Sequence, residues 1–415
     1  MSRLITLSAC LIAAAGCFSI CGRTYAEEIN YNRQVRVLLA QTSNPKLSAP
    51  GEFIIETWRE NQPAEIYYSS SVIEIDADRS GLLIKDENGV FARGLSQLYF
   101  RPRFPNIVLG YGDRIYKGTI ECSIVSLPEN HRDKAKIAVI NVVDMEDYLK
   151  GVLPGELGQR AENEFEALKA QAVAARTYAV WRLYSDGGKH LQATIEDQVY
   201  LGAGAEIPLH NMAVEETEGL VMVYKKEPIA AYYHAVCGGS TIGREKAWGG
   251  KKIDYLKPVD DSLYCSWAKS YSWAETFELN DLGFNLGKYL AEQGRLPARG
   301  FGRLIDIRFH QDGHSRRMME MIVETSTGTF KIECDKIRWA LRRKSQPTAI
   351  LPSTRFDAFA SRQGEEILSL TLEGKGNGHG VGMCQCGAIG RARAGQNWEQ
   401  ILKTYYQGIK FRKIY

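Results

Sequence analysis

One carboxylic acid and several imidazole and sulfur side chains hold the positions in this sequence that could support chemistry. Glu156 directly follows Pro154 and Gly155 and has apolar neighbours on both sides. Because a Pro-Gly pair usually breaks regular structure, we expect Glu156 on a loop or at the entrance of a helix. Burial raises the pKa of a carboxyl group, as a general acid at neutral pH requires. The alternative is that Glu156 only caps a helix or pairs with a lysine.

A glycine-rich loop near the C-terminus, residues 374–388, is the second such signal. It contains His379 between two glycines. A strand is expected before it and a helix after it, beginning near Met383, which would leave backbone N–H groups and His379 facing outward. The loop has neither the Lys-Ser/Thr ending of a phosphate-binding loop nor the register of a dinucleotide-binding motif, so we reject nucleotide binding.

Six cysteines follow the leader segment that is described below. They are Cys122, Cys237, Cys265, Cys334, Cys384 and Cys386. An even number suggests disulfides in an oxidising compartment. A second interpretation is a structural zinc set drawn from His234, Cys237, Cys265, Cys384 and Cys386. Under either interpretation Cys237 and Cys265 should lie near one of the two C-terminal cysteines. A cysteine nucleophile beside His379 is the third alternative.

An alanine-rich helix is expected soon after Glu156. Its apolar residues recur at steps of three and four: Phe165, Leu168, Ala172, Ala175, Ala179 and Leu183. Asn163 can cap its start, and Gly187-Gly188 can end it. Its many alanines would let another backbone, or a sugar, approach closely.

The sequence predicts an α+β fold with a β-rich N-terminal region. Runs of alternating or β-branched residues, separated by Gly, Pro, Asn and Asp, indicate strands over residues 30–143. Residues 134–143 form the last of these and lead directly toward Glu156. We therefore divide the chain into a signal peptide (1–26), a β-rich region (27–133) and a mixed α/β domain with the alanine-rich helix at its centre (134–415).

The first 26 residues are typical of an export signal, with a basic start, an apolar core and small residues at Thr24 and Ala26. The mature chain would then begin near Glu27, in the periplasm or cell envelope. Residues 14–17 loosely resemble a lipobox, but the usual leucine is absent, so lipid anchoring at Cys17 is the less favoured alternative. Nothing downstream is long and apolar enough to span a bilayer.

Composition excludes some classes of function. Hydrophobic residues make up 44% and charged residues 24%, which is ordinary for a globular protein and argues against disorder. The formal net charge of +3, from 52 basic and 49 acidic residues, gives no support for nucleic-acid binding. A weakly charged partner such as a polysaccharide is compatible with this balance.

Five stretches together resemble the stage II sporulation protein D family, also described as amidase-enhancer-like. They are YLKGVLPGEL, EALKAQAVAARTYAV, DQVYLG, HAVCGGST and GHGVGMCQCGA. The resemblance runs from about Lys134 to the C-terminus. Studied members are lytic transglycosylases that cut peptidoglycan glycan strands whose stem peptides have been removed, and their essential glutamate corresponds to Glu156.

The resemblance implies a mechanism with one carboxyl group. Glu156 would protonate the glycosidic oxygen and then, as a carboxylate, help the C6 hydroxyl of muramic acid close onto C1. Water is not the nucleophile, so the second carboxylate of ordinary glycosidases is not required. Four motif residues could line the substrate groove: Arg176, Tyr178, His379 and Gln385. For Arg176 the alternative is a buried ion pair, and for Tyr178 it is a place in the core.

The sequence departs from the family pattern at two places. Some members bind zinc through His and Cys just before the segment matched by DQVY, where this chain reads LQATIE without cysteine. That zinc site is not expected here, and no cofactor is expected beyond the structural zinc alternative. Cys384 and Cys386 stand where many relatives have serine and an aromatic residue.

Three classes of function remain open at this point. The first is a lytic transglycosylase acting on peptidoglycan. The second is a non-catalytic peptidoglycan-binding module that activates or recruits a cell-wall amidase, an N-acetylmuramoyl-L-alanine amidase. The third is a structural envelope protein held together by its cysteines.

Overall fold

The computed structural model describes residues 33–127, 134–184, 187, 189–343 and 349–415. The expected signal peptide and Cys17 lie outside these residues. The described chain has the expected α+β fold, rich in strands, with three large hydrophobic cores and a small fourth cluster. Within it, no helix combines the length and the apolarity that crossing a bilayer requires.

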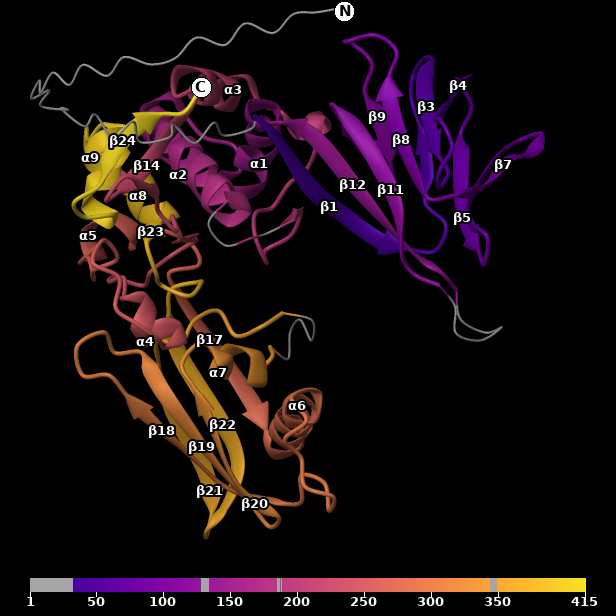
Figure 1. The fold of residues 1–415 in the computed structure, drawn as a ribbon. Helices are drawn as coiled ribbons and strands as arrows, with labels where there is room; N and C mark the ends of the chain where they lie inside the picture. The colour runs from indigo at the N-terminus through magenta and orange to yellow at the C-terminus, as the bar shows by residue number, and fades with distance from the viewer. Residues whose placement is uncertain (1–32, 128–133, 185–186, 188, 344–348) are drawn as a thin grey trace, which may run out of the picture.

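Two sheets, in which nearly all strand pairs are antiparallel, pack together to form the N-terminal β region (Figure 1). The larger has seven strands in the order β13-β1-β12-β11-β8-β3-β4: β13 (Leu191–Gln192), β1 (Gln34–Thr42), β12 (Lys136–Asp144), β11 (Thr119–Ser126), β8 (Gln97–Pro102), β3 (Phe53–Trp58) and β4 (Glu65–Ser69). The smaller has the order β10-β9-β2-β5-β6-β7: β10 (Arg114–Tyr116), β9 (Leu109–Tyr111), β2 (Lys46–Ser48), β5 (Ile73–Asp78), β6 (Gly81–Asp86) and β7 (Gly89–Leu95). In β3 and β5 alternate residues are buried, as the period of two predicts.

Strand β12 joins this β region to the rest of the chain. It pairs antiparallel with both β1 and β11, so the expected boundary between residues 133 and 134 falls inside one sheet. The predicted strand at 134–143 is confirmed as β12, and it continues without a loop into helix α1 (Met145–Leu157). Glu156 is thereby carried on an element anchored to the larger sheet.

The alanine-rich helix is confirmed as α2 (Phe165–Tyr184), but its start differs from the prediction. A 3-10 turn, Glu162–Glu164, precedes it, and Asn163 lies within that turn. The Glu164 carboxylate accepts the Ala161 N–H at 3.0 Å instead. Helix α2 is also buried on nearly all sides, because α3 (Pro208–Glu216), α8 (Gln385–Arg393), α9 (Trp398–Tyr405) and β14 (Leu220–Tyr224) cover it. Its alanines therefore pack against protein.

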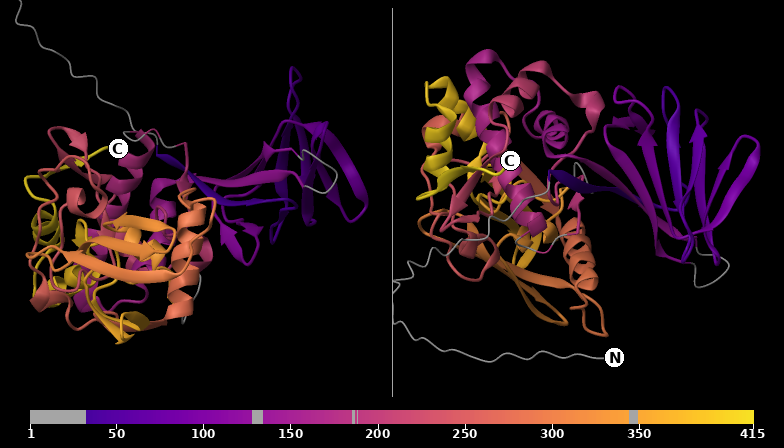
Figure 2. Two further views of the ribbon diagram at one scale, coloured as in Figure 1. Left: turned by 90° about the horizontal axis from the view of Figure 1, so that it is seen from below. Right: turned by 45° about the horizontal axis from the view of Figure 1, so that its top comes forward.

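Short strands complete the central part of the molecule around α2. Strand β14 pairs with β15 (Glu227–Pro228) and with the closing strand β24 (Lys410–Lys413). Strand β16 (Tyr233–His234) lies parallel to β23 (Met383–Cys384), which brings the glycine-rich loop beside residues 233–241. This central part adjoins both the N-terminal β region and a third unit (Figure 1), and in the view from below the third unit lies in front of it while the β region projects to one side (Figure 2).

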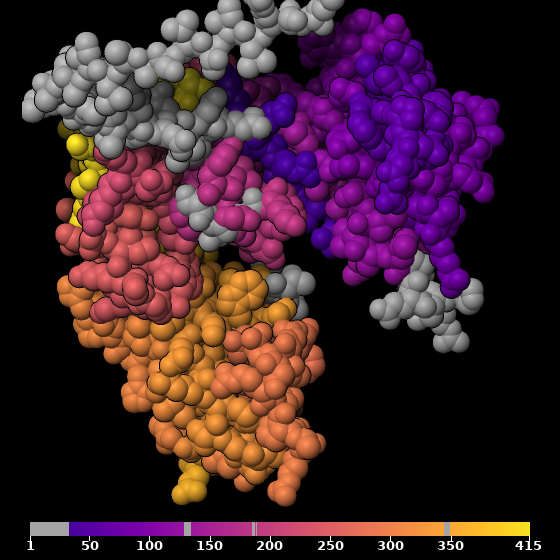
Figure 3. Space-filling model, in the orientation of Figure 1, coloured from indigo at the N-terminus to yellow at the C-terminus, as the bar shows by residue number. Residues whose placement is uncertain are grey.

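The third unit is an inserted domain that the predicted division of the chain did not separate. It follows α4 (Arg244–Trp248) and α5 (Ser262–Cys265) and contains β17 (Ser272–Glu278), α6 (Leu279–Glu292), β18 (Leu304–Gln311), β19 (Met318–Thr325), β20 (Gly328–Glu333), α7 (Lys336–Ala340), β21 (Phe356–Gln363) and β22 (Glu366–Lys375). The first and last strands pair antiparallel, Ser272 opposite Lys375. The domain has its own core and projects as a separate lobe (Figure 3).

Candidate active site

Glu156 lies in the last turn of α1, not on the loop or at the helix entrance that the Pro-Gly pair suggested. Helix α1 continues through Pro154 for three more residues. It ends at Gly158, whose φ of 63° is favourable for glycine and whose N–H donates to the Pro154 carbonyl at 2.9 Å. A proline removes one helical hydrogen bond, and a single remaining turn tolerates that loss.

Glycines on α1 let the segment after β13 approach Glu156 closely. A Cβ atom at Gly155 would lie 2.6 Å from the Val199 carbonyl oxygen, and one at Gly151 would lie 2.6 Å from the Tyr200 ring. Because both positions are glycine, the Val199 N–H reaches the Glu156 Oε1 atom at 2.8 Å. The motifs around Glu156 and DQVY are therefore parts of one site.

The other carboxylate oxygen of Glu156 contacts the glycine-rich motif. Glu156 Oε2 accepts a hydrogen bond from Gln385 Nε2 at 3.1 Å. Gln385 is the first residue of α8, and its Nε2 also lies 3.5 Å from the Oε1 atom of Gln171, a fully buried residue of α2. The expected placement of Gln385 at the site is thus supported, with the carboxylate itself as its partner.

The environment of Glu156 favours its protonated form. Burial raises the pKa of Glu156, and hydrogen bonds from Val199, Gln385 and the Tyr233 hydroxyl lower it by a smaller amount. The net shift is upward, so that the carboxyl group holds a proton at a higher pH than an exposed glutamate does. This combination suits a group that donates a proton and is then stabilised as a carboxylate.

Two residues that the sequence motifs did not single out support the site. The buried Gln198 donates from Nε2 to the Tyr233 hydroxyl at 2.8 Å and accepts from the Tyr148 hydroxyl at 3.0 Å. Burial raises the pKa of Tyr233, which keeps its hydroxyl protonated beside Glu156. The signal for Gln198 was its place inside DQVY, where an uncharged polar residue lies among residues of the core.

His379 supports the site indirectly. Its Nε2 lies 3.0 Å from the Tyr233 carbonyl oxygen, and its Nδ1 accepts the Val381 N–H at 3.1 Å. Burial lowers the pKa of His379 to about 4, so it is neutral at physiological pH. Its ring packs on Trp248, with 4.9 Å between centroids. Both ring nitrogens are engaged, so His379 is unavailable as the base of a cysteine nucleophile and instead holds the glycine-rich loop against β16.

Arg176 and Tyr178 do not contact Glu156. Arg176 is fully buried and forms an ion pair with Glu146, with 2.9 Å between Nε and Oε1. The groove position that we expected for Arg176 is therefore corrected to the ion-pair alternative. The Tyr178 hydroxyl donates to Asp197 Oδ1 at 2.7 Å, and its ring packs against Trp181. Tyr178 thus links α2 to the DQVY segment.

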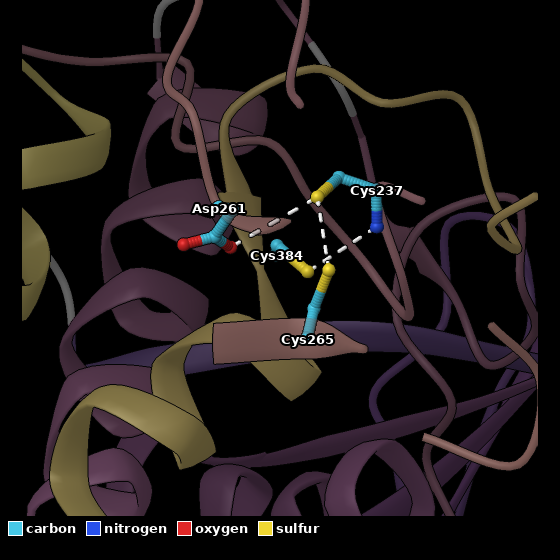
Figure 4. Close-up of side chains that lie close together, drawn as sticks. All are labelled: Cys237, Asp261, Cys265 and Cys384. Carbon is cyan, nitrogen blue, oxygen red and sulfur yellow. Dashed lines mark hydrogen bonds between the residues drawn. The ribbon is translucent and has the colours of Figure 1, made fainter. Parts of the chain in front are cut away.

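The expected grouping of cysteines is confirmed in part (Figure 4). The Sγ atoms of Cys237 and Cys265 lie 3.5 Å apart, and the Cys237 N–H donates to the Cys384 sulfur at 3.2 Å. Asp261, which was not among the predicted residues, completes the cluster. A single aspartate outside any recognised motif offers no sequence signal.

His234 and Cys386, which the predicted zinc set included, are not members of this cluster. His234 Nδ1 lies 3.2 Å from the Val381 carbonyl oxygen. Cys386 follows Gln385 on α8, and its main chain bonds Ala235 and Trp267.

Models of two protein families match the chain. One, described as stage II sporulation protein, matches residues 133–224, which include Glu156, α2 and the DQVY segment. The other, described as a domain of unknown function (DUF8618), matches residues 264–382, which correspond closely to the inserted domain. The second match agrees with the separate core of that domain.

Three relatives illustrate the similarity. An uncharacterized protein of Brachyspira hyodysenteriae is 32% identical over 290 residues, which cover 69% of this chain and 70% of the relative. The amidase enhancer of Bacillus subtilis is 29% identical over 292 residues, or 63% of this chain and 39% of the relative. Stage II sporulation protein D of Bacillus subtilis is 30% identical over 309 residues, which cover 70% of this chain and 80% of the relative. This chain belongs to the stage II sporulation protein D family.

Proposed function

We propose that this protein is a peptidoglycan lytic transglycosylase that cleaves glycan strands between muramic acid and glucosamine. The observation that carries the proposal is the environment of the Glu156 carboxyl group. Burial raises the pKa of this group, and its two oxygens accept hydrogen bonds from the Val199 N–H and the Gln385 amide. The proposed substrate is a strand without stem peptides, as the family resemblance implies. The proposed location is the periplasm or cell envelope, reached through the expected export signal.

In the first step Glu156 donates its proton to the glycosidic oxygen, and the bond from that oxygen to C1 of the muramic acid breaks. The Val199 N–H, the Gln385 amide and the Tyr233 hydroxyl then stabilise the resulting carboxylate, because hydrogen bonds to the charged form favour it. In the second step the Glu156 carboxylate accepts the proton of the C6 hydroxyl, while the C6 oxygen forms a bond to C1 of the same muramic acid. The products are a 1,6-anhydromuramic end and a protonated Glu156, ready for another cycle.

A second acid is not needed for this reaction, and the neighbouring glutamates have other tasks. Glu164 pairs with Arg393 and caps the turn before α2. Glu166 accepts the Trp398 N–H at 2.8 Å and pairs with Lys169. Glu162 is exposed on the 3-10 turn. These positions support our assignment of the chemistry to Glu156 alone.

The test uses denuded glycan strands, with products identified by mass spectrometry. The wild-type protein should release fragments with 1,6-anhydro ends. Glu156→Gln should fold and bind the strands but cut them about 10²–10⁴ times more slowly, the range for loss of a general acid. Glu162→Gln is the matched control and should cut at the wild-type rate. If wild-type protein gives no anhydro product, or Glu156→Gln cuts as fast as wild type, the proposal fails.

The alternative function is a non-catalytic module that activates or recruits an N-acetylmuramoyl-L-alanine amidase. The similarity to the amidase enhancer of Bacillus subtilis favours it, although only 39% of that relative is covered. Under this alternative the protein should raise the rate at which an added amidase releases stem peptides from intact wall. Glu156→Gln would then retain the full effect, which separates the two functions.

A further inference from the structure

We propose that Cys237, Cys265, Cys384 and Asp261 bind one Zn²⁺ ion as a structural metal site. This site does not depend on the lytic activity proposed above. It differs from the zinc position of some family members, which lies just before the DQVY segment and has no cysteine in this chain. Three sulfurs and a carboxylate form a donor set that suits Zn²⁺, since thiolates select it over hard cations such as Mg²⁺ and Ca²⁺.

The positions of the donor atoms fit a tetrahedral ion. One ligand atom from each of the four residues lies within 4.8 Å of every other, and all four residues are buried. A tetrahedral ion with bonds of about 2.3 Å to sulfur and about 2.0 Å to oxygen separates its ligands by roughly 3.5–3.8 Å. The Cys237 and Cys265 sulfurs are already 3.5 Å apart, so small side-chain shifts would complete the coordination.

Backbone amides are directed at the sulfurs. Cys384 Sγ accepts the N–H groups of Cys237 at 3.2 Å and Gly387 at 3.3 Å, and Cys237 Sγ accepts that of Gly239 at 3.4 Å. Such donors stabilise thiolates and orient them, as the outer partners of metal ligands do. In the space beside Cys384, a Cβ atom at Gly387 would lie 1.7 Å from Asp261 Oδ2, so glycine at this position admits the carboxylate.

Hydrogen bonds from two side chains hold the Asp261 carboxylate in place. Its Oδ1 accepts from Arg391 Nη2 at 2.8 Å, and its Oδ2 accepts from the Tyr405 hydroxyl at 2.6 Å. Several ionised ligands in one enclosed space repel each other, and the guanidinium groups of Arg391, on Asp261, and Arg317, on the Cys237 carbonyl, offset part of their charge. A divalent cation would remove this penalty for all four ligands together.

A disulfide is the competing explanation for the sulfurs. A bond between Cys237 and Cys265 requires about 2.05 Å between them and would use two of the three cysteines. A disulfide would not explain why the Cys384 sulfur accepts hydrogen bonds from two backbone N–H groups. It would also not explain why the Asp261 carboxylate lies beside the three cysteine sulfurs. One metal ion accounts for all four residues, so we favour the metal.

The position of the cluster suggests what the ion would stabilise. Cys265 ends α5 just before the inserted domain, and Cys384 follows that domain and directly precedes Gln385. Cys237 lies in the segment that follows β16, and β16 itself carries Tyr233. The ion would therefore join three segments at the base of the inserted domain and fix the start of α8, from which Gln385 reaches Glu156.

Metal analysis of protein purified without chelator tests the site. We expect about one Zn²⁺ per chain, and after exchange with Co²⁺ a thiolate-to-cobalt charge-transfer absorption. Cys265→Ser and Cys384→Ser should each weaken Zn²⁺ binding by more than the 10–100-fold typical for loss of an outer partner. Cys334→Ser, which alters a partly buried cysteine outside the cluster, is the matched control and should keep the metal.

Two results would overturn the proposal. One is wild-type protein that contains no Zn²⁺ and gives no thiolate-to-cobalt absorption on titration with Co²⁺. The other is peptide mapping that finds Cys237 and Cys265 joined as a disulfide in the purified protein. Both measurements use the unaltered chain, so they decide the question even if a serine variant fails to fold. Cobalt absorption without the thiolate band would show binding elsewhere and would also refute the site.

Discussion

The Gln385 side chain donates a hydrogen bond of 3.1 Å to the Glu156 carboxylate across 229 positions of sequence. It joins the motifs YLKGVLPGEL and GHGVGMCQCGA at one pair of atoms. Gln385 is the first residue of α8, and Glu156 lies in the last turn of α1. The ends of two helices therefore meet at the proposed catalytic group.

Replacing Gln385 with methionine should move the pH profile of strand cleavage. The Gln385 hydrogen bond lowers the pKa of Glu156, so its loss should raise that pKa further. Glu156 must be protonated to act first, and activity therefore falls as pH rises through its pKa. The alkaline limb of kcat/KM should shift upward by about one pH unit, since a hydrogen bond to a charged group contributes roughly 1.5–3 kcal/mol. Gln363→Met, at an exposed position of β21, should leave the limb in place. An unmoved limb in Gln385→Met would show that the contact does not tune Glu156.

Replacing Gly155 with alanine should damage both stability and activity. The new Cβ atom would lie 2.6 Å from the Val199 carbonyl oxygen and push that segment away from α1. Overpacking of this kind costs about 1–3 kcal/mol in unfolding free energy, measurable by urea denaturation. The Val199 N–H would also move from Glu156, so cleavage should slow more than the loss of folded protein explains. Gly313→Ala has open space around its Cβ atom and should be nearly neutral. Equal stability and activity in Gly155→Ala would refute the close approach.

Replacing Arg176 with methionine should destabilise the fold without acting on substrate directly. The change leaves the Glu146 carboxylate buried without its main partner, which costs about 3–5 kcal/mol. Adding Glu146→Gln should restore part of that loss, which a double-mutant cycle by chemical denaturation would measure. A stable Arg176→Met protein that no longer binds glycan strands would instead favour the groove position.

Acid should unfold the protein in part through His379. Its pKa is about 4 in the folded chain against 6.5 in the unfolded one, so the unfolded state binds the proton first. Stability from this group is complete above about pH 6.5 and is lost as pH falls toward 4, by up to a few kcal/mol. His379→Gln keeps a donor for the Tyr233 carbonyl but does not titrate. Its unfolding free energy should therefore depend less on pH between 4 and 6.5. An unchanged slope in His379→Gln would contradict this account.

The sequence predicted local elements well where a periodic pattern or a motif was present. Helix α2 follows from its three- and four-residue steps, and β12 from its continuous apolar run. The full burial of α2 did not follow, because two of the helices that cover it, α8 and α9, come from the far end of the chain. The Pro154-Gly155 pair misled the prediction of a loop or helix entrance, because α1 continues past Pro154 for a last turn that tolerates the missing hydrogen bond.

The candidate site was predicted in outline only. Motifs identified Glu156 and Gln385, and cysteine spacing suggested a cluster. Asp261 and Tyr233 were not predictable, because their roles depend on which segments β16 and β23 bring together. The inserted domain was missed for a different reason. Its strands follow α5 without a run of linker-like composition, so nothing in the sequence marks its edge.

The paired strands at the ends of the inserted domain have a consequence for how chains of this kind diversify. Ser272 lies opposite Lys375, so the polypeptide leaves and re-enters the central part at neighbouring points. Closing an inserted segment costs free energy because the chain loses conformational entropy. This cost grows only with the logarithm of the segment's length, by about 0.6 kcal/mol for each doubling. Segments of very different size can therefore be accommodated at this place without displacing the residues around Glu156. Under the proposed function, the inserted domain is the place where reach and selectivity toward the glycan strand can change while the residues around Glu156 stay the same.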